Sequence, residues 1–193
     1  MSLTLDPQKT ALVLIDLQQG IVGMPRAPHA ADEVVRRAAE LGRAFAAAGA
    51  TIVRVRVAFA ADFADQLKLP VDAPMQRPPG GLPADWSDFV PEIAALPKVI
   101  EITKRQWSAF HGTELDLQLR RRRITTMGLA GRATNFGVES TARDAWQHNY
   151  AVVIAEDATT SVDAELHRLA IEKILPRIAR VRSTAEVLKA FGR

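Results

Sequence analysis

Residues 131–141, GRATNFGVEST, follow the apolar run MGLA at positions 127–130 and form the segment that decides the fold. The apolar run is typical of a buried strand, and the residues VESTARDAW from Val138 are typical of a helix start. A strand, a turn of small residues and a helix N-terminus place backbone N–H groups at the end of a sheet, where they can bind a developing anion. A nucleophile turn has this arrangement, yet Gly137 stands where the nucleophile is expected. The sequence therefore predicts an anion-binding turn without a nucleophilic side chain.

The rest of the chain supplies alternating strands and helices. Short apolar runs, typical of strands, occupy 11–15, 51–59, 99–103, 124–130, 150–155 and 178–181. Patterns typical of helices occupy 32–48 and 163–175, and three further helical segments begin at Thr113, Val138 and Ser183. Such alternation is typical of βαβ units, which build a mostly parallel sheet with helices on both faces. The predicted fold class is therefore α/β, with a doubly wound, mostly parallel, six-stranded sheet. Within the second run, Arg54 and Arg56 fall on one side, which suggests a strand near an edge or a contact with a partner chain.

The composition narrows the class of protein. With 193 residues, 48% of them apolar and 24% charged, the chain is expected to form one domain over 1–193. Cysteine is absent, which excludes disulfides, thiolate metal sites and cysteine nucleophiles. No apolar stretch approaches the roughly 20 residues of a membrane helix, and the first residues lack the charged region and apolar core expected of a secretory leader. We expect a soluble, cytoplasmic protein that has no membrane partner.

The net charge of +3 does not indicate a nucleic-acid partner. The one dense basic run, residues 120–123, ends a predicted helix, where cations suit the helix dipole, and no aromatic residues are interleaved with it.

A proline-rich segment, residues 60–96, interrupts the alternation. Six prolines and a Gly80–Gly81 pair break any long element there. A loop of this length is usually a lid or an interaction surface, and Trp86 and Phe89 are expected to anchor it. The sequence leaves open whether the loop covers the site of its own chain or of a neighbouring subunit.

Three features are predicted to lie at the carboxyl ends of strands, where ligands bind in open parallel sheets. Asp16 follows the first strand, Lys104 follows the third, and residues 132–137 follow the fourth. Together they would provide a carboxylate, a cation and an oxyanion-binding turn, which is a workable hydrolytic set. Asp16 could instead simply bond its own turn.

The sequence contains no recognisable cofactor or metal motif. The first strand is followed by DLQQGIV, which lacks a dinucleotide fingerprint, and no Walker sequence is present. The four histidines, His29, His111, His148 and His167, show no metal-ligand spacing, and the last two are expected at the surface or in packing. The sequence therefore predicts neither a cofactor nor a metal.

Four blocks of the sequence resemble the isochorismatase-like hydrolases, also called cysteine hydrolases. They read LVLIDLQ at 12–18, KRQWSAFHGTELDLQLR from Lys104, GRATNFGVESTARDAW from Gly131 and VVIAEDATTS from Val152. The resemblance spans nearly the whole chain and implies a three-layer α/β/α, Rossmann-like fold in a homo-oligomer, a dimer or a tetramer. It also implies an Asp–Lys–Cys triad in which the Asp activates a thiol for attack on a small-molecule substrate.

Transferred residue by residue, the resemblance assigns catalytic positions to Asp16, Lys104 and Gly137, where Gly137 occupies the position of the absent Cys. The backbone of Ala133 and Gly137 takes the oxyanion role, and the peptide bond between Arg132 and Ala133 is where the family often has a cis bond. Substrate-binding positions fall on five further residues: Gln18, Trp107, Thr134, Asn135 and Phe136.

The missing thiol changes the expected chemistry. Without a cysteine, a thioester intermediate is impossible. Strand two, which ends in VRVAFA, also lacks the Asp-x-His metal pattern of nicotinamidases. Thr134 and Ser140 lie close to the missing thiol in sequence, but they are better explained as turn and cap residues than as replacement nucleophiles. True isochorismatases also lack the Cys and cleave a vinyl ether by protonating its carbon, which would make Asp16 a general acid. Strand two has Val57 and Ala58 where the resembling enzymes carry a substrate-binding glutamine.

We therefore expect a hydrolase that acts on a small molecule, by preference an anionic one, without a covalent intermediate. Asp16 would be its general acid or base, in vinyl-ether or related C–O or C–N hydrolysis. The alternative is a catalytically inactive binding or scaffold protein in which Asp16 and Lys104 form only a buried ion pair.

Overall fold

The computed structural model describes residues 3–74 and 80–191, and its centre is a six-stranded sheet. All neighbouring strands are parallel, in the order β3-β2-β1-β4-β5-β6, which confirms the predicted α/β fold. The order reverses between β1 and β4, so the carboxyl ends of these two strands form the expected position of a ligand site. The strands are β1 (Thr10–Ile15), β2 (Thr51–Val57), β3 (Val99–Lys104), β4 (Thr126–Arg132), β5 (Ala151–Thr160) and β6 (Arg180–Arg182).

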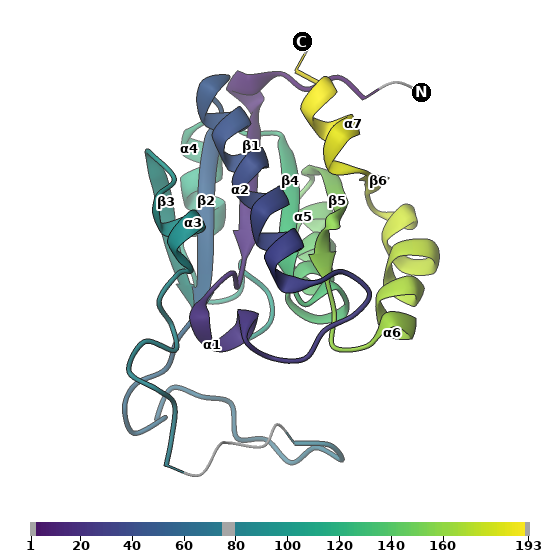
Figure 1. Ribbon diagram of the computed structural model, residues 1–193. Coiled ribbons are helices and arrows are strands. Elements are labelled where there is room, and N and C mark those ends of the chain that lie inside the picture. Colours follow the sequence, from purple (N-terminus) through teal and green to yellow (C-terminus); the bar gives the residue numbers. More distant parts are fainter. Residues whose placement is uncertain (1–2, 75–79, 192–193) are drawn as a thin grey trace.

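Helices cover both faces of the sheet and make three layers (Figure 1). One face packs against α2 (Ala31–Ala47), α3 (Pro91–Ala94) and α7 (Thr184–Lys189), and the other against α4 (Leu115–Arg121) and α5 (Glu139–Gln147). The remaining helical elements are short: η1 (Pro7–Lys9), α1 (Gln19–Val22), η2 (Thr134–Val138), α6 (Ala164–Leu169), η3 (Ala170–Ile174) and η4 (Leu175–Arg177).

Strand β1 lies between the two cores and explains their formation. Successive side chains of a strand point to opposite faces, so Leu12 and Leu14 pack on the α2 side while Val13 and Ile15 pack on the α5 side. The whole strand is buried, as expected for a parallel strand covered on both faces. This burial fixes the position of the residue that follows, Asp16.

The two arginines of β2 find partners within the chain. The Arg54 guanidinium bonds the Glu101 carboxylate on β3, and both guanidinium groups lie over the Phe89 ring, 4.7 and 5.5 Å from its centroid for Arg54 and Arg56. Strand β2 is one position in from the edge strand β3. A partner chain is therefore not needed to explain these two charges.

The long loop, of which residues 58–74 and 80–90 are described, extends away from the body at the end where α1 lies (Figure 1). Its returning end is attached to the body, because Gln18 and Phe89 form an antiparallel bridge and the Gly20 N–H donates to the Trp86 carbonyl at 3.0 Å. The indole of Trp86 also packs so tightly on Gly20 that a Cβ there would lie 1.9 Å from Trp86 Cδ1. These contacts confirm that Trp86 and Phe89 anchor the loop. Residues 75–79, part of the predicted proline-rich segment, lie outside the described residues.

In the described ranges, no helix is both long enough and apolar enough to cross a membrane.

Candidate active site

Asp16 and Lys104 meet at the carboxyl ends of the strands. Asp16 directly follows β1, adopts φ 52°, and its N–H donates to the Val55 carbonyl at 2.9 Å. Lys104 ends β3, and its side chain crosses the end of the intervening β2 to place Nζ 2.7 Å from Asp16 Oδ2. Both residues are buried, with exposed fractions of 6% for Asp16 and 2% for Lys104. The fold therefore brings together the carboxylate and the cation that the sequence placed at separate strand ends.

The two oxygens of Asp16 have different surroundings. Oδ2 accepts from Lys104, whereas the buried Oδ1 has no hydrogen-bond partner among the described residues. Burial raises the pKa of Asp16 to about 6, against the opposing effect of the Lys104 charge and hydrogen bond. A carboxyl group with such a pKa can carry a proton on Oδ1 near neutral pH.

The turn after β4 faces this pair. The peptide bond between Arg132 and Ala133 is cis, and η2 follows with the N–H groups of Phe136 and Val138 both donating to the Ala133 carbonyl at 3.1 Å. A Cβ on Gly137 would lie 3.2 Å from Asp16 Oδ2. The backbone of Gly137 therefore stands beside the Asp16 carboxyl.

Gly131 permits the close approach of this turn to β1. Its φ is 119°, which a residue with a side chain rarely adopts, and an added Cβ would lie 2.1 Å from the Ile15 carbonyl oxygen. Glycine is therefore required where β4 enters the turn.

The five residues predicted to bind substrate fall into two groups. Trp107 is exposed and its ring packs 4.9 Å from that of Phe136, so these two aromatics form an accessible wall. Gln18, in contrast, is fully buried, and its amide bonds both backbone groups of Val57 and the Trp86 carbonyl. The side chains of the other two are also engaged by the protein: Thr134 bonds His167 and Asn135 bonds Ser161.

The Arg132 side chain turns away from Asp16. Its guanidinium is buried and donates to three backbone carbonyls, those of Ile21, Met24 and Pro25, and burial lowers its pKa to about 10. Lys104, in contrast, bonds the Asp16 carboxyl group directly.

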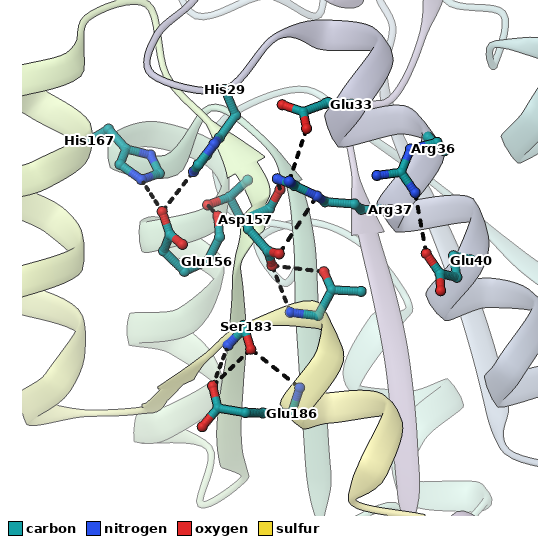
Figure 2. Close-up of polar contacts among 12 residues, drawn as sticks. His29, Glu33, Arg36, Arg37, Glu40, Glu156, Asp157, His167, Ser183 and Glu186 are labelled. Atoms are coloured by element: carbon teal, nitrogen blue, oxygen red, sulfur yellow. Dashed lines mark hydrogen bonds and ion pairs between the residues drawn. The ribbon is translucent and has the colours of Figure 1, made fainter.

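Sequence reasoning missed a cluster formed by His29, Glu156 and His167. Both imidazoles point toward the Glu156 carboxylate (Figure 2), although the three residues are distant in the sequence. His167 was expected in surface or packing contexts, and it is instead buried and bonded at both ring nitrogens. No local spacing signals such a cluster, because its members come from a loop, a strand and a helix.

The chain is thus an α/β protein in which a carboxylate and a lysine lie beside a glycine-containing turn at the switch point of a parallel sheet, the position where ligands bind in such folds. The isochorismatase domain matches residues 10–186. The chain is 52% identical over 189 residues to the isochorismatase family protein YecD of Escherichia coli O157:H7, covering 98% of this chain and 100% of that protein. It is 47% identical over 188 residues to YwoC of Bacillus subtilis (strain 168), covering 97% of each. A solved isochorismatase family protein from Burkholderia thailandensis is 41% identical, with full coverage of both chains and a TM-score of 0.93.

The chain belongs to the isochorismatase family and has its hydrolase fold.

Proposed function

We propose that this protein hydrolyses a small molecule without forming a covalent enzyme intermediate, and that Asp16 is its general acid and base. The observation that carries the proposal is the environment of Asp16. In the part of the chain that the structure describes, its Oδ1 is buried without a hydrogen-bond partner, and burial raises the pKa of the carboxyl group to about 6. A group that is partly protonated near neutral pH is suited to proton transfer in both directions.

The favoured reaction is hydrolysis of a vinyl ether or a related C–O or C–N bond. The proton on Asp16 Oδ1 would be transferred to the terminal carbon of the vinyl group, which leaves an oxocarbenium ion and the Asp16 carboxylate. Water would then add to the cationic carbon as Asp16 accepts a proton from it. The resulting hemiketal would collapse to a carbonyl compound and an alcohol. Because no step uses a nucleophilic side chain, the absence of one at Gly137 is no obstacle.

Lys104 would bind both the Asp16 carboxylate and an anionic group of the substrate. An ammonium group has three donors, and among the described residues Nζ donates to Asp16 Oδ2 and to the Gln106 carbonyl at 3.1 Å. The third N–H is thus available for an acidic group of the substrate. The Trp107 and Phe136 rings would contact its apolar part, and the backbone of Ala133 and Gly137 would hold the substrate or the attacking water against Asp16.

The test is a substrate screen with vinyl ethers, amides and esters, using the wild type and Asp16→Asn. The same substitution at Asp72, an exposed residue, is the matched control. We expect turnover on an anionic vinyl ether or a related substrate, a loss of at least about a hundredfold in Asp16→Asn, and unchanged turnover in Asp72→Asn. Turnover that survives in Asp16→Asn would eliminate Asp16 as the proton donor.

The second candidate is a binding or scaffold protein without turnover. It is favoured by the direct ion pair of Lys104 with Asp16, which could exist for structural reasons alone. Thermal-shift measurements with the same compounds distinguish the two. A compound that raises the melting temperature and is never converted would support the binding protein.

We also propose that the protein assembles as a homo-oligomer, a dimer or a tetramer. The long loop exposes three apolar side chains at alternate positions, Leu67, Leu69 and Val71, which a second copy could cover. Light scattering coupled to gel filtration would give the mass directly, and a mass of one chain would contradict the proposal.

A further inference from the structure

His29, Glu156 and His167 place three potential metal ligands around one point, apart from the Asp16–Lys104 pair. His29 lies in the loop before α2, Glu156 in β5 and His167 in α6. The Nε2 atoms of His29 and His167 lie 2.7 and 3.1 Å from Glu156 Oε1, and the three potential ligand atoms are all within 4.8 Å of one another. Figure 2 shows both rings directed at the same carboxylate.

We propose that the two Nε2 atoms and the Glu156 carboxylate bind one divalent transition-metal ion, with Zn²⁺ as the best match. Two imidazoles and one carboxylate form a common ligand set for Zn²⁺, with a fourth position left to water. With neutral imidazoles the three side chains carry one net negative charge, which favours a cation. The site is independent of the proposed hydrolysis, none of whose steps uses these residues.

The geometry needs only small adjustments to accept the ion. Ligand atoms of a tetrahedral zinc site stand about 3.3 Å apart, given bonds of about 2.0–2.2 Å. The two nitrogen–oxygen distances, now 2.7 and 3.1 Å, would therefore have to widen by about 0.6 and 0.2 Å, and the two nitrogens, which lie within 4.8 Å of one another, would have to reach the same separation. The His29 and Glu156 side chains are 22% and 31% exposed, so they have room to move and leave one side of the site open to water.

His167 is oriented as a metal-binding histidine usually is. Its Nδ1 lies 2.9 Å from the Thr134 hydroxyl oxygen, and both residues are buried. Metal-binding imidazoles almost always use the second nitrogen in such a hydrogen bond, which fixes the ring and its tautomer. A hydroxyl group can both donate and accept a hydrogen bond. In the metal-free ring, with the proton on Nε2, the Thr134 hydroxyl would donate to Nδ1. In the metal-bound ring, with the proton on Nδ1, the same hydroxyl would accept from Nδ1.

The neighbouring charges do not compete for Glu156. Arg37, the cation beside this region in Figure 2, donates from Nη2 to the Glu33 carboxylate at 3.0 Å and from Nη1 to the Asp157 carbonyl oxygen at 2.7 Å. In addition, Glu156 Oε2 has no hydrogen-bond partner in the described part of the chain, so it remains available to the ion.

The test is a Zn²⁺ titration of the chelator-treated full chain, in competition with a chromophoric chelator, together with Co²⁺ absorption spectroscopy. We expect one ion per chain and a Co²⁺ absorption spectrum typical of a four-coordinate ion. The variants His29→Gln and Glu156→Gln should each weaken binding at least about tenfold. His111→Gln changes an exposed histidine outside the cluster and should leave the affinity unchanged.

A second measurement uses the wild type alone, in case a variant fails to fold. Nitrogen NMR of the imidazoles should show the protons of His29 and His167 moving from Nε2 to Nδ1 when one equivalent of Zn²⁺ is added. Absence of stoichiometric binding, or unchanged histidine signals, would show that the cluster is held by hydrogen bonds only. Equal affinity of the wild type and His29→Gln would place the ion elsewhere and overturn the proposal.

Discussion

A Cβ atom built on Gly137 lies 3.2 Å from Asp16 Oδ2 and 3.1 Å from Ile15 Cγ2. Both distances are short for such contacts, so the backbone of the turn is almost in contact with the carboxyl group. A side chain at this position would therefore project beside Asp16, at the cost of a small shift of its neighbours.

Gly137→Cys should give a protein that folds and carries a reactive thiol. The Asp16 carboxylate can accept the thiol proton, and the turn can stabilise an oxyanion formed by attack of the sulfur. The tight contacts should cost about 1–3 kcal/mol of the free energy of unfolding. Rates of alkylation by a thiol probe give the reactivity, and Gly23→Cys, at an exposed position, is the control. Equal rates in the two variants would mean that the environment of residue 137 does not activate a thiol.

The pH dependence of turnover should reveal whether Asp16 acts as an acid. Burial raises the pKa of its carboxyl group from 3.8 to about 6, so the protonated form dominates below that pH and disappears above it. If protonation of the substrate limits the rate, kcat/KM should be constant at low pH and fall tenfold per pH unit well above pH 6. A profile that rises through pH 6 would show that the carboxylate, acting as a base, limits the rate instead.

Glu156→Gln should destabilise the metal-free protein in a pH-dependent manner. The hydrogen bond from His167, followed by that from His29, lowers the Glu156 pKa from 4.5 to about 2 in the folded chain. Its contribution to stability is therefore present above pH 4.5 and is lost as the pH falls toward 2. Because Glu156 is partly exposed to solvent, we expect a difference of about 1–2 kcal/mol at pH 7.

Denaturant unfolding of wild type and Glu156→Gln across this pH range measures the effect. Glu40→Gln is the control, since Glu40 forms only an exposed helix pair with Arg36 and should change stability by less than about 1 kcal/mol. A difference that stays constant from pH 7 to pH 2 would contradict the assigned role of the carboxylate.

Gly20→Ala should release the returning end of the long loop. A Cβ at position 20 would overlap the Trp86 indole, at 1.9 Å from Cδ1, so the ring must leave its place. We expect faster limited proteolysis within residues 58–90 and only a modest loss of global stability. Gly23→Ala is the control, because its nearest contact would be an ordinary 3.5 Å. Equal cleavage rates in the two variants would show that Trp86 does not secure the loop.

The sequence predicted the parts of the fold that depend on local pattern. The buried run of β1 and the start of the last helix at Ser183 were both visible as residue patterns, and in the structure Ser183 forms a capping box with Glu186. Strand β5 was predicted to end at residue 155 but continues to Thr160, because after an irregularity near Gly131 it pairs again with β4 through Arg132 and Thr160. That pairing depends on tertiary structure, which the pattern does not contain.

In the candidate site, too, the sequence predicted the residues that local pattern marks and missed the contacts that only folding creates. Asp16 and Lys104 were found because each ends an apolar strand, and parallel strands bring such ends to one edge. Gln18 was assigned to substrate binding, but its amide bonds Val57 and Trp86, which are distant from it in sequence. The histidine cluster was invisible for the same reason, since its members become neighbours only in the folded chain.

The side-chain amide of Gln18 links the two ends of the long loop. It bonds the N–H and carbonyl of Val57, where the chain leaves the sheet, and the carbonyl of Trp86, where the chain returns. Because both ends of the loop are held by one side chain, the length and composition of the intervening segment can change without moving Asp16. The entropic cost of such changes is small, about 0.6 kcal/mol for a doubling of loop length. Selectivity for a substrate could therefore diverge, or be redesigned, by exchanging this loop segment while Asp16 and Lys104 stay constant.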